Sequence, residues 1–124
     1  MIDETLQAFF KKSACIDKRG FHSYYLVEKN NQYEIQDDEV AVGRTLSIQY
    51  NDENEVKLSL YSDGLPLVDV QRIPISKVTI IKDKDEESIQ FVLERMPSRM
   101  LKVNVKPHFS IQFTMYWEVC EDCE

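Results

Sequence analysis

FSIQFTMYWEV, residues 109–119, alternates an apolar residue with a polar or amphipathic one at every step. Successive side chains of a β-strand point to opposite faces, so the six apolar residues of this stretch fall on one face. They are Phe109, Ile111, Phe113, Met115, Trp117 and Val119. The stretch therefore predicts a long half-buried strand, and its apolar face requires a hydrophobic core to pack against.

Other segments show the same alternation and are separated by residues that favour turns. Asn30-Asn31 and Asp63-Gly64 are typical of hairpin turns, because asparagine, aspartate and glycine accept positive φ angles. A further polar turn at residues 51–54 separates two clearly alternating segments. The predicted strands before the final one cover residues 21–29, 32–36, 46–50, 56–61, 65–71, 78–82 and 100–106.

Two prolines mark the middle of the chain as a place where a sheet ends or bends. Pro66 and Pro74 lack the backbone donor of a regular ladder, so we expect this part at a sheet edge or corner. We expect the side chains that face the core to change there from even-numbered to odd-numbered positions. They are Val68 and Val70 before the change, and Ile73 and Ile75 after it.

The segment Asp85 to Met96 permits two interpretations. As a helix it would begin at a capping Asp85 and present a stripe that includes Ile89, Leu93 and Met96. As a strand it would alternate through Ile89, Phe91 and Leu93 after a polar turn. We favour the strand, because the flanking segments are strands and connections between neighbouring strands are short.

Residues 2 to about 12 predict a short amphipathic helix. Asp3 is a candidate cap, and Ile2, Leu6, Phe9 and Phe10 form an apolar stripe at helical spacing. Such a stripe either covers the protein's own sheet or docks on a partner. At this length we expect the helix to lie over the sheet as a lid.

Together these segments predict one domain, residues 1–124, of the mainly β class, with α+β as the alternative. Eight or nine strands would cover about half of the chain, which exceeds the usual fraction of roughly a quarter. The strands follow one another without the spacing of β-α-β units. We therefore expect an antiparallel sheet curled into a barrel or sandwich, with one N-terminal amphipathic helix.

Charge and composition narrow the classes of function. The formal net charge is −7, which disfavours direct binding to nucleic acid and suits a basic protein partner. No apolar run approaches the roughly 18 residues of a membrane span, and the N-terminus lacks the pattern of a signal peptide. With an odd number of cysteines, 3 in all, the sequence indicates a cytoplasmic protein without membrane contact.

The sequence lacks the local signatures of the common catalytic sites. Its 3 glycines are isolated, which excludes a P-loop and a G-x-G-x-x-G turn, and there is no G-x-S-x-G elbow. Cys120 and Cys123 form a C-x-x-C motif, but no second pair completes four zinc ligands. We therefore predict no enzyme, no cofactor and no metal, while metal binding by these two cysteines remains an open alternative.

Acidic clusters and tyrosines on polar strand positions indicate a binding function. Acidic residues recur in four places: residues 34–39, 52–55, 83–87 and 118–124. Outward tyrosines beside carboxylates are common anchors of protein interfaces. The candidate binding residues are Tyr61, Tyr116, Glu118, Glu121 and Asp122.

These features predict a small acidic protein that masks a basic protein partner, such as a toxin or nuclease. Immunity proteins, antitoxins and phage-encoded inhibitors are the classes of this kind. Two alternatives are a β-barrel module that binds a small apolar ligand and a structural subunit of a phage or secretion assembly. The sequence identifies neither the partner nor the oligomeric state.

Overall fold

The computed structural model describes residues 2–39 and 42–115. Within these ranges one helix precedes nine strands, so the predicted mainly β class with an N-terminal helix is confirmed. The elements are α1 (Ile2–Phe10), β1 (Cys15–Ile16), β2 (His22–Lys29), β3 (Gln32–Gln36), β4 (Arg44–Tyr50), β5 (Glu55–Ser62), β6 (Leu65–Lys82), β7 (Glu87–Leu93), β8 (Arg99–Lys106) and β9 (Ser110–Met115).

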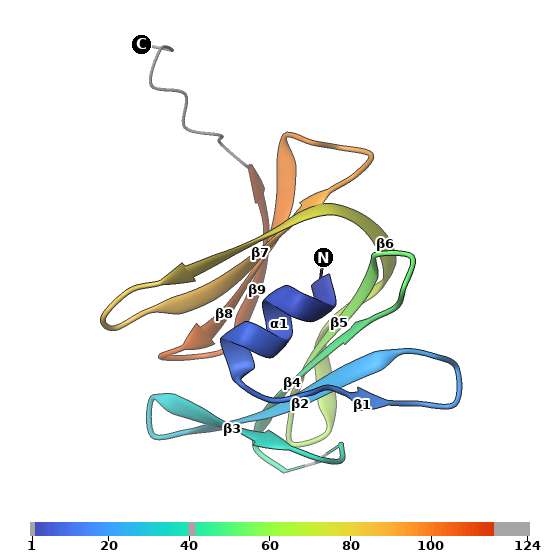
Figure 1. Ribbon diagram of the computed structural model, residues 1–124. Coiled ribbons are helices and arrows are strands. Elements are labelled where there is room, and N and C mark those ends of the chain that lie inside the picture. Colours follow the sequence, from blue (N-terminus) through green and yellow to red (C-terminus); the bar gives the residue numbers. More distant parts are fainter. Residues whose placement is uncertain (1, 40–41, 116–124) are drawn as a thin grey trace.

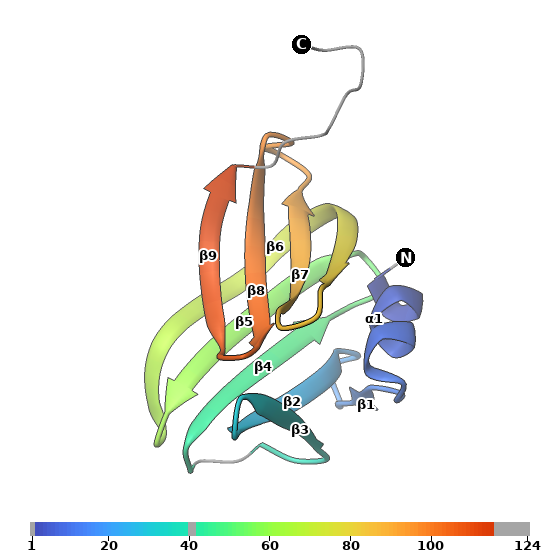
Figure 2. The ribbon, with the colours of Figure 1, turned by 90° about the vertical axis from the view of Figure 1, so that its left-hand side faces the viewer.

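The strands form one antiparallel sheet in the order β1-β2-β4-β5-β6-β7-β8-β9, with β3 also paired to β2. β4 occupies one edge of β2, and β1 and β3 pair with different residues along the other edge. The sheet curls so that β7–β9 cross over the strands of the first half (Figure 2). It is not closed into a barrel, and that predicted alternative is wrong. α1 lies between the two halves, where closure would leave no room for a helix (Figure 1).

β6 carries the chain from one half of the sheet to the other. Its first part pairs with β5 and its last part with β7, and the register with β5 shifts at two irregularities. One of them separates the Val70 and Ile73 pairings, which accounts for the predicted change of inward parity. The expectation of a sheet edge or corner is therefore confirmed, because Leu65 to Pro74 pair with β5 only and the ladder with β7 begins at Ile75.

Two hairpin turns and one strand follow the sequence predictions. Asn30 and Asn31 have φ angles of 47° and 64°, and Asp63 and Gly64 have 49° and 82°, as a two-residue type I′ turn requires. β7 occupies the segment that permitted two interpretations, so the strand interpretation is confirmed.

α1 forms the lid predicted for it. Ile2, Leu6 and Phe10 are buried, and they join a core cluster that also includes Leu58 and Phe91 from the two halves of the sheet. The predicted cap is wrong: Asp3 lies inside the first turn of the helix. Its carboxylate accepts hydrogen bonds from Gln7 Nε2 at 2.8 Å and from the Tyr50 hydroxyl at 2.6 Å.

The apolar face of the final strand is buried at one end only. Phe109 is 1% exposed, whereas Phe113 is 57% and Met115 39% exposed. The predicted burial of these last two residues is therefore wrong. Leu101, which pairs with Phe113, is only 4% exposed, so at this end the core covers β8 and not β9, the outermost strand of the sheet (Figure 2). Residues 116–119 lie outside the described residues.

The turn between β8 and β9 is attached to the first half of the sheet. The Glu28 carboxylate accepts hydrogen bonds from the Phe109 N–H at 2.8 Å and lies 3.1 Å from His108 Nδ1. Arg44 Nη2 donates to the Phe109 carbonyl oxygen at 2.8 Å, and its Nε lies 3.4 Å from the same carboxylate. These contacts hold the curled sheet together at one corner.

Candidate functional site

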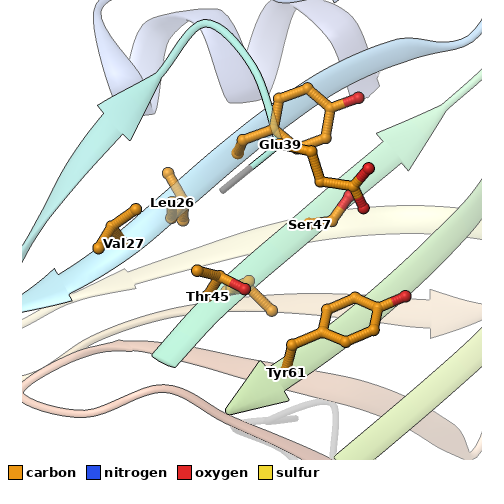
Figure 3. A pocket seen from close by; sticks show the side chains of 8 residues that line it. Leu26, Val27, Glu39, Thr45, Ser47 and Tyr61 are labelled. Carbon is orange, nitrogen blue, oxygen red and sulfur yellow. The ribbon is translucent and has the colours of Figure 1, made fainter. Parts of the chain in front are cut away.

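Two tyrosines flank a narrow slot on the outer face of β2, β4 and β5. The register places Tyr25 opposite Ser47 and Tyr61 opposite Thr45, so a floor of small polar residues separates the two rings. Figure 3 shows Thr45 and Ser47 on this floor, with Tyr61 to one side and Glu39 to the other. The slot has a volume of about 10 Å³, which holds about one water molecule. It is too small for an organic ligand.

The segment after β3 brings three exposed carboxylates beside this slot. They belong to Asp37, Asp38 and Glu39. Lys12, just after α1, forms an ion pair of 2.9 Å with Asp37, which raises the pKa of the lysine. The Cys15 thiol donates to the Asp37 carbonyl oxygen at 3.4 Å. The start of this acidic segment is thus attached to the chain that leads from the helix into β1.

A shallow hollow joins the acidic segment to the turn after β1. Asp17 lines it together with Asp37, Asp38 and Glu39, and so do Ile16 and Tyr25. The side chain of Ile16 is 70% exposed. We call the surface formed by Ile16, Asp17, Tyr25, Asp37, Asp38, Glu39 and Tyr61 the acidic face.

Asp17 is fixed in position and ionised. Its Oδ1 accepts hydrogen bonds from the backbone N–H of Phe21 at 2.9 Å and of Arg19 at 2.8 Å. These N–H groups lower the pKa of Asp17, because they stabilise the charged carboxylate. The acidic face therefore has a rigid anion on one side of the hollow and exposed anions on the other.

Acidic residues elsewhere in the described part of the chain are more often paired. Glu34 lies 3.0 Å from Lys29 Nζ, Glu55 lies 2.7 Å from Arg72 Nη2, and Glu87 lies 3.2 Å from Lys106 Nζ. Asp38 and Glu39 form no ion pair with any residue that the structure describes. The acidic face therefore presents two carboxylates, those of Asp38 and Glu39, without a paired cation among the residues that the structure describes.

A second polar cluster connects α1 to the sheet. His22 Nε2 lies 3.3 Å from Asp52 Oδ1, and its ring stacks on Tyr50 at a centroid distance of 5.0 Å. The hydroxyl of Tyr50 donates to Asp3, and this hydrogen bond lowers the pKa of the aspartate. Burial, together with this bond, raises the pKa of Tyr50. A tyrosine in this state is a poor nucleophile, so we assign the cluster to anchoring the helix.

The predicted binding residues differ in what the structure says about them. Tyr61 lies on the acidic face, as the sequence suggested for an outward tyrosine. Tyr116, Glu118, Glu121 and Asp122 lie outside the described residues, as do Cys120 and Cys123. Among residues 2–39 and 42–115, no group of three or more His, Cys, Asp or Glu side chains is arranged to hold a metal ion.

Sequence reasoning missed three members of the acidic face. Ile16, Asp17 and Tyr25 come from β1, the following turn and β2, and they join the acidic segment only through strand pairing. The alternation along β2 contained one signal, because an inward Tyr24 requires an outward Tyr25.

No helix in the described part of the chain is long and apolar enough to cross a membrane.

Comparison with known proteins gives a family and no closer relative. Neither the curated proteins nor the solved structures contain a match to this sequence. One family model matches residues 8–122, a range that includes the acidic face and β9. The chain therefore belongs to the family described as Protein of unknown function (DUF3979).

Proposed function

We propose that this protein is a binding module whose acidic face covers a basic segment of a partner protein. The observation that carries the proposal is the unpaired charge of Asp38 and Glu39 beside the exposed apolar side chain of Ile16. Lysine and arginine have an apolar stem and a cationic head, so they suit a surface that places an aliphatic group beside carboxylates. Tyr25 and Tyr61 add the amphipathic rings that often anchor interfaces.

The class of partner follows from this chemistry. A protein that binds nucleic acid exposes lysine and arginine side chains that neutralise phosphates. An acidic module that occupies those side chains blocks access of the nucleic acid by charge and by bulk. A basic toxin or nuclease is a partner of this kind. Blocking such a partner is how an immunity protein, antitoxin or phage-encoded inhibitor acts.

The alternative of a small-ligand cup has less support. The space between the two halves of the sheet holds α1 and large side chains, and Leu6, Ile89 and Phe91 are each 0% exposed. The slot between the tyrosines has room for about one water molecule. The interior is therefore occupied by the protein's own residues.

Charge reversal on the acidic face tests the proposal. The partner is captured from the source cells by the wild-type protein, identified, and produced in pure form for calorimetry. We expect the double variant Asp38→Lys with Glu39→Lys to weaken binding by about tenfold or more, because attraction between opposite charges becomes repulsion. Raising the salt concentration should weaken the wild-type complex in the same direction.

A matched control separates the acidic face from net charge. Asp85→Lys with Glu94→Lys changes the net charge by the same amount at two exposed positions outside the acidic face. This variant should keep its affinity within about threefold, since it alters long-range attraction only. Equal weakening by both double variants, or a complex that is insensitive to salt, would count against the acidic face as the binding surface.

A further inference from the structure

β9 has an outer edge that no described strand occupies. It is the last strand in the order of the sheet and pairs with β8 only. Every second residue of an edge strand directs its N–H and C=O groups away from the sheet, where they offer a template for another strand. The edge runs over six residues, Ser110–Met115, without a register shift against β8.

This edge lacks the devices that prevent strands from pairing. Its sequence, SIQFTM, contains no charged residue, no proline and no glycine. The other edge of the sheet is different: β1 has only two residues, and β3 carries Glu34 in an ion pair with Lys29. Short strands and charges are the usual protection of an edge, so β9 is the edge open to a partner strand.

The side chains of β9 point to the same conclusion. Phe113 and Met115 are 57% and 39% exposed, although both lie on the parity that faces the core at Phe109. A strand added beside β9 would place its own side chains next to them on the same face of the sheet. Such pairing would remove apolar surface from water as well as complete the ladder.

We propose that β9 pairs antiparallel with β9 of a second copy of this chain. The two-fold axis passes through Phe113, so that Phe113 faces its equivalent, Ile111 faces Met115, and Gln112 faces Thr114. Opposed residues of antiparallel strands share a face, hence apolar side chains meet apolar ones and polar meet polar. The two sheets become one continuous sheet.

The absence of charged residues on β9 limits the repulsion that a second copy of the chain would meet at this edge. Two molecules of net charge −7 repel one another, and β9 is a strand on which no carboxylate would oppose another. The acidic face is carried by β1 and the turn after it, β2, the segment after β3, and Tyr61 of β5, none of which pairs with β9. The dimer therefore does not rest on the proposed function and leaves the acidic face open.

The oligomeric state in solution tests this proposal. Sedimentation velocity of the wild-type protein should give the mass of a dimer that dissociates on dilution. Phe113→Lys should raise the dimer dissociation constant by about tenfold or more, because two cations would face each other at the axis. Leu65→Lys is the matched control: Leu65 is 69% exposed on β6, and this variant should dimerise like the wild type.

A second pair of variants tests the register. Gln112→Lys with Thr114→Lys opposes like charges in both polar pairs and should be monomeric. Gln112→Lys with Thr114→Glu opposes unlike charges in the same pairs and should dimerise. Circular dichroism checks that each variant is folded. A monomeric wild type, equal behaviour of these two variants, or equal loss by Phe113→Lys and Leu65→Lys would overturn the proposal.

Discussion

Replacing Leu6 with alanine is expected to lower the free energy of unfolding by about 3–4 kcal/mol. Leu6 is 0% exposed and lies in the middle of α1, inside the core shared by the two halves of the sheet. Truncation removes the buried methyl groups and leaves a cavity, and both terms reduce stability. Alanine is the best helix former, so the loss comes from packing and not from helix propensity. Unfolding in urea or guanidinium chloride measures it.

A substitution on the opposite side of the same helix is the control. Ala8 is exposed, and Ala8→Ser should change the free energy of unfolding by no more than about 0.5 kcal/mol. A loss below about 1 kcal/mol in Leu6→Ala would mean that α1 is not part of the folded core. The competing interpretation, in which the apolar stripe of the helix docks on a partner, would then be favoured.

The elements that the sequence predicts well are those fixed by neighbouring residues. The Asn30-Asn31 and Asp63-Gly64 turns depend on the φ angles of two adjacent residues, which their side chains reveal. The hairpin of β4 and β5 depends on alternation within each strand. Leu46 and Leu60 pair directly and are both buried, as their parity requires. Local information was sufficient for these features.

The predictions that failed required long-range information. The alternation of β9 fixes which side chains share a face, but it does not say how far the core extends along that face. Phe113 is exposed although its cross-strand neighbour Leu101 is buried, so the core ends between β8 and β9 at this point. Closure of the sheet likewise depends on the space taken by α1 and on the bend of β6, neither of which follows from the pattern of any one strand.

The same distinction applies to the acidic face. Tyr61 and the cluster of Asp37 to Glu39 could be recognised from parity and composition alone. Asp17 could not, because its position depends on hydrogen bonds from two backbone N–H groups and on the pairing of β1 with β2. For a surface built from turns, the sequence therefore predicts which types of residue it contains, but not which individual residues come together to form it.

The carboxylate of Glu28 is expected to contribute stability that depends on pH. Burial raises the pKa of Glu28, but the Phe109 N–H, His108 and Arg44 outweigh it, so the pKa lies below its usual value of 4.5. A group with a lowered pKa in the folded state stabilises the protein fully above its unfolded pKa. That contribution is lost as the pH falls through the folded pKa. The free energy of unfolding should therefore decrease below about pH 4.5.

Glu28→Gln isolates this contribution from the other carboxylates. At pH 7 we expect the variant to be less stable than the wild type by about 2 kcal/mol, because it weakens the charge-assisted hydrogen bonds at the β8–β9 turn. At pH 3, below the usual value of 4.5, this carboxylate takes up a proton in the unfolded chain, which lowers the stability of the wild type, so the difference between the two proteins should shrink. Denaturant unfolding at both pH values measures this difference.

Glu34→Gln is the matched control for the loss of one carboxylate. Glu34 lies on the neighbouring strand β3 in an exposed ion pair with Lys29, and such pairs contribute about 0–1 kcal/mol. This variant should therefore differ little from the wild type at either pH. If Glu28→Gln were as stable as the wild type at pH 7, or equally destabilised at pH 7 and pH 3, its charge would not hold the β8–β9 turn. The corner of the curled sheet would then depend on Arg44 and on the packing of Phe109 alone.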